Sequence, residues 1–152
     1  MKAKITKKTV TPATSEQLVD VVAESILDRK GEKVISMNLS NIEDAMTDSF
    51  IICEANSTRQ VGAIAEHIIE KTKELLNESP IYVEGQNTSE WVLLDYVNVV
   101  VHVFLRPKRY VYKLEELWGD AATTIEYLPD GTQKNIDFRT TSFSSSNTEI
   151  EY

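Results

Sequence analysis

The stretch that decides the fold is Trp91–Leu105, WVLLDYVNVVVHVFL, the most apolar segment of the chain. Its valine and aromatic content favours strand over helix, and it is too long for one ordinary strand. We therefore predict two central strands joined by a tight turn near Val97-Asn98, whose register depends on whether the turn has two residues. In the register that a two-residue turn gives, the opposed pairs are Trp91 with Phe104, Leu93 with His102, and Asp95 with Val100.

Side chains alternate across a sheet, so this strand pair has two faces of different character. One face is almost purely apolar and is predicted to be core: Val92, Leu94, Tyr96, Val99, Val101 and Val103. The other, here called the mixed face, carries Trp91, Leu93, Asp95, Val100, His102 and Phe104. We expect function on the mixed face because it combines an indole, a carboxylate and an imidazole with aliphatic side chains. One extra residue in the turn would shift the pairing by one position, so that different side chains of the two strands would share a face.

Length and charge limit both the number of domains and the kind of partner. A chain of 152 residues is enough for one domain with a real core and too short for two of ordinary size. The net charge is −8, and residues 11–119 carry 18 acids against 10 bases, whereas residues 1–10 carry four lysines and no acid. Nucleic-acid binding rests on Lys and Arg that neutralise phosphates, so no direct DNA or RNA binding by the body is expected. A basic protein is the better electrostatic partner.

The single cysteine and the absence of long apolar runs indicate the compartment. Cys53 excludes an internal disulfide and fits a reducing environment. It lies in the apolar run Phe50–Cys53, which predicts a buried structural thiol. Because the sequence shows no apolar stretch of membrane-spanning length and no signal core, we expect a cytoplasmic protein without membrane contact.

Helix and strand signals predict one compact α/β domain over residues 14–119, with a mixed sheet and helices packed on it. Two helices are predicted to begin with capping boxes, at Thr14 with Gln17 and at Ser57 with Gln60. The second helix should end at Pro80, with Leu75 and Leu76 on its apolar stripe. Strands are expected over 33–39, 49–54 and 81–84. A last helix after Pro107 should end at Gly119 and bury Tyr110 or Val111, Leu114, Leu117 and Trp118.

Both ends of the chain are predicted to lie outside this domain. Residues 1–13 are expected to be a disordered, lysine-rich arm. Residues 120–152 are expected to form an extension, in which the Pro129-Asp130-Gly131 turn joins a small hairpin before a disordered Ser/Thr-rich tail. Deleting residues 120–152 should then leave the domain folded.

A search for catalytic or metal-binding patterns gives only weak candidates. The sequence has no glycine-rich phosphate loop, no nucleophile elbow and no metalloprotease motif, and its only imidazoles are His67 and His102. His67 is interpreted as a solvated residue. Two alternatives stay open, a His102–Asp95 acid–base dyad and a magnesium site at Asp48 and Asp95. We expect no catalytic residues, no resident metal and no cofactor.

Six motifs occur in the order that is typical of one protein family. They are Thr47-Asp48-Ser49-Phe50-Ile51-Ile52, Ser57-Thr58-Arg59-Gln60-Val61, Glu84-Gly85, Trp91-Val92-Leu93-Leu94-Asp95, Val99-Val100-Val101-His102-Val103-Phe104, and Tyr112-x-Leu114-Glu115-x-Leu117-Trp118. Together they closely resemble the Iojap family, the bacterial ribosomal silencing factors, over residues 15–119. The chain departs from the family pattern at Gln86, where Glu is typical, and at Val97-Asn98, where Gly-Asp is usual. The extension lies outside the motifs.

The resemblance implies a binding protein rather than an enzyme, on a fold that resembles nucleotidyltransferases. Members of the family bind ribosomal protein number fourteen of the large subunit, block association of the two subunits and repress translation when nutrients are scarce. Related organelle proteins act in large-subunit assembly, and homodimers are common among relatives. The alternatives are a small magnesium-dependent nucleotidyltransferase-like enzyme using Asp48, Asp95 and His102, and an adaptor unrelated to ribosomes.

Five residues are the predicted contacts with the ribosomal partner: Trp91, Asp95, Tyr112, Leu114 and Glu115. The aromatic side chains offer large rigid contact area, and the two acids can pair with Lys or Arg. Trp91 and Leu114 are also candidates for the core, and Asp95 for capping a turn. Leu117 and Trp118 are assigned to the core, and His102 and Phe104 are predicted to be secondary contacts.

Overall fold

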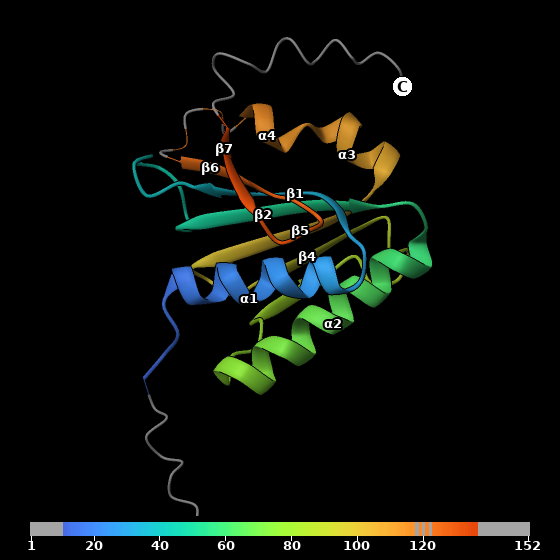
Figure 1. The fold of residues 1–152 in the computed structure, drawn as a ribbon, viewed down its shortest axis with the longest axis horizontal. Coiled ribbons are helices and arrows are strands. Elements are labelled where there is room, and N and C mark those ends of the chain that lie inside the picture. The colour runs from blue at the N-terminus through green and yellow to red at the C-terminus, as the bar shows by residue number, and fades with distance from the viewer. Residues whose placement is uncertain (1–10, 118, 120, 122, 137–152) are drawn as a thin grey trace, which may run out of the picture.

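The chain folds around one mixed seven-stranded sheet in the order β3-β4-β5-β2-β1-β6-β7 (Figure 1). The computed structural model describes residues 11–117, 119, 121 and 123–136. Only the β2–β5 pair is parallel, and the other neighbours are antiparallel. The elements are α1 Ser15–Asp28, β1 Glu32–Asn38, β2 Ser49–Ala55, α2 Thr58–Leu76, β3 Tyr82–Glu84, β4 Trp91–Asp95, β5 Val99–Leu105, α3 Arg106–Tyr112, α4 Leu114–Leu117, β6 Thr123–Tyr127 and β7 Gln133–Ile136. Within the described residues, no helix has the length and apolarity needed to cross a membrane.

The two faces of the sheet are covered very differently. Helices α1 and α2 lie side by side on one face, and the apolar half of the central strand pair packs against them in the main core. The mixed face instead packs under α3, α4 and the loop of residues 39–47, around a smaller cluster that includes Met37, Ile52 and Phe104. The two longer helices, α1 and α2, therefore cover the first face. Of the described segments, only the short helices α3 and α4 and a loop cover the second face.

The predicted register of the central strands is confirmed. Trp91 pairs with Phe104, Leu93 with His102 and Asp95 with Val100. The turn is closed by Tyr96 N, which donates to Val99 O at 2.8 Å. Because the turn has two residues, the mixed face carries the side chains that were assigned to it.

The turn itself holds Val97 in an unfavourable conformation. Its φ is +79°, and Asn98 N donates across it to Tyr96 O at 3.0 Å, which makes a γ-turn. A β-branched residue with positive φ is strained by about 1–3 kcal/mol. Glycine, which the family usually has here, adopts this conformation without steric cost.

We therefore expect Val97→Gly to stabilise the protein by about 1 kcal/mol, after allowing for the greater freedom of glycine in the unfolded chain. Val97 is 57% exposed, so little packing is lost. The expected gain in Tm is about 2–4 °C by thermal unfolding. Val100→Gly, at a position without positive φ, is the control and should lower Tm. Equal losses in both variants would show that the turn holds no relievable strain.

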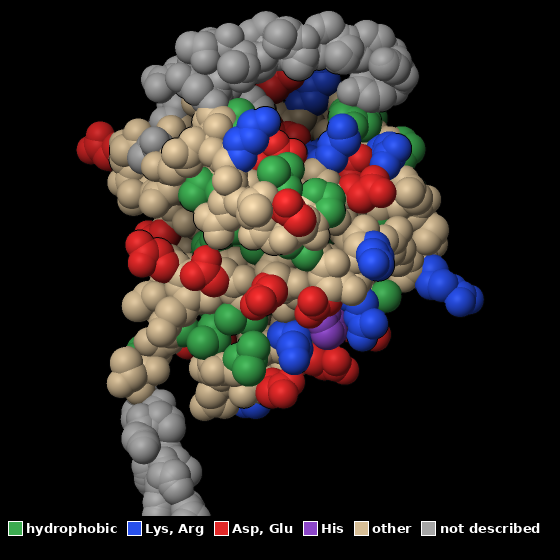
Figure 2. Space-filling view, in the orientation of Figure 1, with side chains coloured by type: hydrophobic (Ala, Val, Ile, Leu, Met, Phe, Trp, Pro, Cys, Tyr) green, Lys and Arg blue, Asp and Glu red, His purple; other side chains and the backbone are tan. Residues whose placement is uncertain are grey.

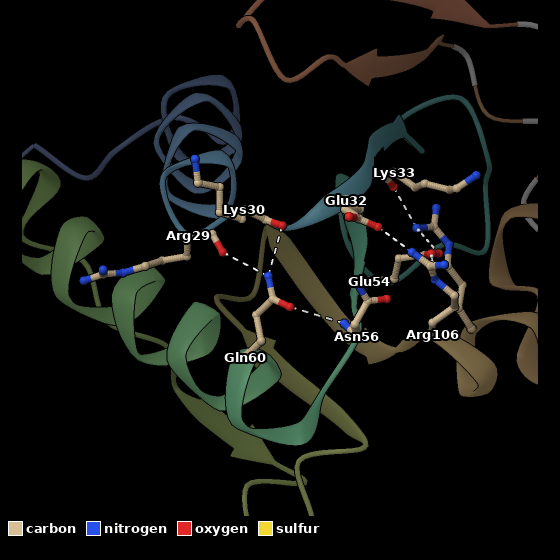
Figure 3. Close-up of polar contacts among 9 residues, drawn as sticks. Arg29, Lys30, Glu32, Lys33, Glu54, Asn56, Gln60 and Arg106 are labelled. Atoms are coloured by element: carbon tan, nitrogen blue, oxygen red, sulfur yellow. Dashed lines mark hydrogen bonds and ion pairs between the residues drawn. The ribbon is translucent and has the colours of Figure 1, made fainter.

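The first two helices begin as predicted, and only the capping of α2 differs from the prediction. Thr14 caps α1 in a complete capping box with Gln17. Ser57 caps α2 by accepting from Gln60 N, but the Gln60 amide accepts from Asn56 N rather than completing the box. The Gln60 amide also donates to the carbonyls at the end of α1, Arg29 O and Lys30 O (Figure 3). The residue thus ties the two helices together.

The end of α2 and its apolar stripe differ from the prediction. The helix stops at Leu76 because Asn77 takes a left-handed conformation, φ +57°, three residues before Pro80. Leu75 is 55% exposed, so its assignment to the apolar stripe is wrong. Leu76 beside it does pack against the main core, as predicted.

The predicted helix after Pro107 is in fact two short helices. Lys113 has φ +48° and separates α3 from α4. Val111, in α3 before the break, is 69% exposed. The break changes the helical phase of the residues that follow it, and Leu117 is 71% exposed. The assignment of Leu117 to the core is wrong, and the side chain of Trp118 lies outside the described residues.

The hairpin predicted in the extension is present, but it belongs to the main sheet. β6 pairs with β7 across the Pro-Asp-Gly turn, and β6 also pairs with β1 from Val34–Tyr127 to Asn38–Thr123. Tyr127 is part of the main core. Removing residues 120–152 would expose the edge of β1 and take Tyr127 from the core, so we expect the deletion to lower stability, and that the rest of the domain stays folded remains a prediction. Residues 1–10 of the predicted arm and 137–152 of the predicted tail lie outside the described residues.

Candidate functional site

The mixed face carries an aromatic cluster beside α3, here defined as Trp91, His102, Phe104 and Tyr112. The ring centroids of Trp91 and Tyr112 are 4.5 Å apart, and those of Trp91 and Phe104 are 4.8 Å apart. Phe104 is fully buried, whereas Trp91 is half-buried and Tyr112 is 45% exposed. The structure therefore brings two of the predicted contact residues together and buries Phe104 beneath them. The secondary contact of Phe104 with a partner stays a prediction.

The start of β4 is positioned by the close approach of Gly85. Gly85 has φ +91°, and a Cβ at this position would lie 2.0 Å from Trp91 O. No larger residue fits between the end of β3 and Trp91. The glycine of the Glu84-Gly85 motif thus lets the backbone after β3 pass close to the backbone of Trp91 in the aromatic cluster.

His102 is a buried, neutral member of the cluster. Its Nδ1 accepts a hydrogen bond from Trp91 Nε1 at 3.1 Å. Burial lowers the pKa of His102 to about 4, so the ring is uncharged at neutral pH. An indole N–H can only donate, so Nδ1 is the acceptor nitrogen and the proton of the neutral ring is on Nε2. Leu93, not Asp95, lies opposite His102, as the predicted register required. Among the described residues His102 Nδ1 bonds to Trp91 and Asp95 Oδ1 to Val97 N, so the alternative of a His102–Asp95 dyad gains no support from the geometry.

The burial of His102 predicts a specific acid sensitivity. Between its ordinary pKa of 6.5 and the folded value of about 4, the unfolded chain binds a proton that the folded chain does not. The free energy of unfolding therefore falls as pH is lowered through this window, by about 3 kcal/mol in full. Denaturant unfolding of the wild type and His102→Gln at pH 7, 6, 5 and 4 measures this difference. The wild type should lose more stability than the variant, and parallel losses would contradict the prediction.

Asp95 lies at the opposite end of β4 from Trp91, roughly 13 Å along the strand. It is half-buried, and its Oδ1 accepts from Val97 N at 2.8 Å. No hydrogen bond to its Oδ2 is present among the described residues. Asp95 therefore caps the central turn with one oxygen, and its contact with a partner stays a prediction.

The predicted pairing of Asp48 with Asp95 around magnesium finds no support in the geometry. Asp48 Oδ2 accepts from Ser15 Oγ at 2.8 Å, and Ser15 Oγ accepts from Asn98 Nδ2 at 3.0 Å. This carboxylate joins the start of α1 to the central turn. In the part of the chain that the structure describes, no group of three or more His, Cys, Asp or Glu side chains is arranged to hold a metal ion.

A buried network of charges anchors α3 and α4 to the sheet. Glu54 on β2 is fully buried and forms ion pairs with Arg109 Nη1 at 3.3 Å and with Arg106 Nε at 2.8 Å. Arg106 reaches on to Glu32 at the start of β1 (Figure 3). Arg109 is 4% exposed, and it also pairs with Glu115 at 2.8 Å and donates to Lys33 O at 2.7 Å. Burial alone would lower the pKa of Arg109, but Glu115 and Glu54 outweigh it and raise the pKa, so the guanidinium stays charged.

This network changes the interpretation of Glu115 and Leu114. Glu115 Oε2 is held by Arg109, so the carboxylate positions α4. Leu114 is partly buried against the smaller cluster of the mixed face. Both residues hold the short helices in place, and their contact with a partner stays a prediction. The exposed apolar side chains described on α3 and α4, besides Tyr112, are Val111 and Leu117.

A groove opens on the mixed face between the loop of residues 39–47 and the central turn. Its volume is about 430 Å³. Its lining residues are Leu39, Asp44, Ala45, Met46, Thr47, Phe50, Ile81, Leu93, Asp95, Val97, Val100 and His102. Met46 is 93% exposed and Ile81 is 70% exposed, so apolar side chains stand at its mouth. Sequence reasoning found Asp95 but missed Met46, Thr47 and Ile81, because residues 40–47 carry no periodic pattern.

Two smaller predictions have opposite outcomes. Cys53 is fully buried, and burial raises the pKa of its thiol to about 12, which confirms a structural thiol. His67, predicted to be solvated, has a side chain only 13% exposed, and its Nε2 lies 3.1 Å from Asp28 Oδ2. That prediction is wrong, because His67 lies between α1 and α2 rather than on the outer side of α2.

The surface charge is mixed in the view that shows α1 and α2 below the sheet and α3 and α4 above it. Figure 2 shows acidic side chains spread over this view, with basic and apolar side chains among them. No continuous basic patch covers the described part of this view. Phosphate backbones need such a patch, and the view offers none.

Comparisons with known proteins give a consistent result. A family model described as ribosomal silencing factor during starvation matches residues 12–150. It therefore extends through the hairpin, which the six motifs had left outside. The ribosomal silencing factor RsfS of Halalkalibacterium halodurans is 38% identical over 113 residues, covering 72% of this chain and 92% of that protein. A mouse protein named mitochondrial assembly of ribosomal large subunit protein 1 is 35% identical over 74 residues, covering 47% of this chain and 32% of its own length.

Solved structures show the same fold. A crystal structure of a Chromobacterium violaceum protein matches with a TM-score of 0.67 and 33% identity, over 70% of this chain and 88% of that one. A structure from Bacillus halodurans matches with a TM-score of 0.61 and 36% identity, over 68% of this chain and 95% of that one. The implied likeness to nucleotidyltransferases stays a prediction.

Proposed function

The chain belongs to the ribosomal silencing factor family, and from that premise we propose that it represses translation by a specific contact. It binds ribosomal protein number fourteen of the large ribosomal subunit and blocks association of the small subunit when nutrients are limiting. The contact is made by the mixed face and acts without catalysis, in the cytoplasm. The observation that carries the proposal is the open part of that face, where Trp91 and Tyr112 form an aromatic surface and Asp95 a separate acidic one.

The chemistry of the mixed face supports a basic protein as the partner. Trp and Tyr are enriched at interface centres because they offer large area with few rotatable bonds. Asp95 has one oxygen without a hydrogen bond among the described residues, and Asp44 lies exposed at the same groove. The body as a whole is acidic. These features attract Lys and Arg side chains and repel exposed RNA phosphates.

Subunit association measured by light scattering tests the proposal. Purified protein is added to isolated small and large subunits at a magnesium concentration that allows them to associate. We expect the scattering increase to be lost when the protein is first mixed with large subunits, and to be kept when it is mixed with small subunits only. Normal association in the presence of bound protein would contradict a blocking role.

A role in large-subunit assembly is the second candidate function. It is favoured by the name of the mouse relative, which refers to assembly of the mitochondrial large subunit. Deletion of the gene distinguishes the two roles during growth in rich medium. Accumulation of large-subunit precursors there indicates assembly, whereas a defect confined to starvation indicates silencing.

We also propose that the free protein forms a homodimer, through apolar side chains that the partner covers in the complex. Val111, Tyr112 and Leu117 form such an exposed group on α3 and α4. Light scattering coupled to size-exclusion chromatography measures the mass, and Val111→Asp should yield the monomer. A monomeric wild type at all concentrations would exclude the dimer.

A further inference from the structure

The groove on the mixed face contains two buried polar atoms that have no hydrogen-bond partner within the described ranges of the chain. They are His102 Nε2 and Thr47 Oγ1, and both residues line the groove. Buried polar atoms in native proteins are nearly always hydrogen-bonded, and those that are not need an explanation. His102 Nε2 carries a proton, because Nδ1 accepts from the Trp91 indole. The groove therefore holds at least one N–H donor that lacks an acceptor among the described residues.

The other groove side chains define what the missing ligand must contain. Leu39, Ala45, Leu93 and Val100 make apolar walls that suit methylene groups. Asp44 and Asp95 are the acidic members of the lining, and no Lys or Arg is among the lining residues. This charge favours a cation and disfavours phosphates and nucleotides.

We propose that the groove binds one long basic side chain, Lys or Arg, of the partner protein. The aliphatic stem lies along the apolar walls, and the cationic head reaches the oxygen of Asp95 that the turn does not use. The main-chain carbonyl of the same residue accepts hydrogen bonds from His102 Nε2 and Thr47 Oγ1. This inference rests on the proposed function, because it names the chemical group by which that partner is held.

The ring of Phe50 lies beside the imidazole that carries one of the two atoms. This ring is in edge contact with the imidazole of His102, with centroids 4.9 Å apart, and Phe50 also lines the groove. Both His102 Nε2 and Thr47 Oγ1 are covered in the free protein. Binding therefore includes a rotation of the Phe50 ring away from the imidazole.

Two substitutions separate binding from stability. Thr47→Val keeps the shape of the side chain and removes a buried hydroxyl that has no partner, so Tm should not fall. Affinity for isolated large ribosomal subunits should fall about tenfold, because the ligand carbonyl loses one donor. Val100→Phe fills the groove from a half-buried strand position that favours aromatic residues, and it should reduce binding further. Leu75→Phe on the exposed side of α2 adds the same ring elsewhere and should bind like the wild type.

The partner side is tested with purified ribosomal protein number fourteen in which each Lys and Arg is changed to Ala in turn. One substitution should weaken binding to the wild type at least about tenfold and have a much smaller effect on binding to Asp95→Asn. In ¹⁵N-labelled protein, the His102 Nε2–H resonance should shift when the unmodified ribosomal protein binds.

Each contrary result has a definite meaning. If the wild type binds and both groove variants bind equally well, the groove inference fails while the proposed function stands. A lower Tm for Thr47→Val shows a structural hydroxyl and also overturns the inference. If Val100→Phe loses binding but no Lys or Arg of the partner matters, the occupant is apolar and the inference is wrong. If the wild type binds no large subunits, both proposals fail.

Discussion

Replacing Asp95 by lysine is expected to reduce affinity for large ribosomal subunits at least about thirtyfold. Asp95 is half-buried beside the groove, and one of its oxygens has no partner among the described residues. Losing one member of a buried charge pair at an interface costs about 2–5 kcal/mol, and charge reversal adds repulsion. A solvent-exposed pair at the rim would cost no more than about 1 kcal/mol. The size of the loss therefore distinguishes the centre of an interface from its rim.

Two control variants separate the charge of Asp95 from its structural role. Asp95→Asn keeps an oxygen that can accept from Val97 N, so the central turn should survive while the charge is lost. Glu66→Lys makes the same charge change on the exposed side of α2 and should bind like the wild type. Thermal unfolding of each variant shows whether the fold is intact. Wild-type affinity in Asp95→Lys would exclude this face as the contact surface.

Replacing Arg109 by methionine is expected to cost about 3–5 kcal/mol of stability. The guanidinium is 4% exposed and pairs with Glu54, which is fully buried, and with Glu115. Without it, Glu54 keeps only the Arg106 pair, and the Lys33 carbonyl loses its donor. For a chain of this length, Tm should fall by roughly 10 °C or more.

The double variant Glu54→Gln/Arg109→Met tests whether the loss comes from the unpaired charge. The double variant should recover part of the stability that is lost in Arg109→Met, because a neutral amide replaces the uncompensated carboxylate. Lys108→Met is the matched control on the same helix, because its contact with Glu90 at 3.5 Å is exposed. A loss in Lys108→Met as large as in Arg109→Met would show that the helix, not the buried pair, is sensitive.

The central strands were predictable because their signal is local. Alternation over residues 91–105 and a two-residue turn determine both the register and the mixed face, and Thr14 with Gln17 determines where α1 begins. The same local signals do not mark the break at Lys113, since lysine has no preference for positive φ. The phase of α4 was therefore wrong, and with it the burial of Leu117.

The rest of the site depends on contacts between residues far apart in the sequence. Glu54 and Arg109 are 55 positions apart, and only the fold brings them together. An acid in the apolar strand of residues 49–55 was a usable signal for a buried ion pair, but it does not identify the partner. The loop of residues 39–47 forms one wall of the groove. Its position is determined by the strands β1 and β2 that it joins, and the loop's own sequence does not predict it. Trp91 and Asp95 were predicted from the alternation of β4, and Thr47 and Met46 were not.

Sucrose-gradient sedimentation of extract from starved cells tests the central claim most directly. The fractions are blotted for this protein and for proteins of both subunits. The account predicts that the protein sediments with free large subunits and is absent from joined ribosomes, and that Asp95→Lys remains at the top of the gradient. A wild-type protein that stays at the top, or that sediments with joined ribosomes, would contradict it.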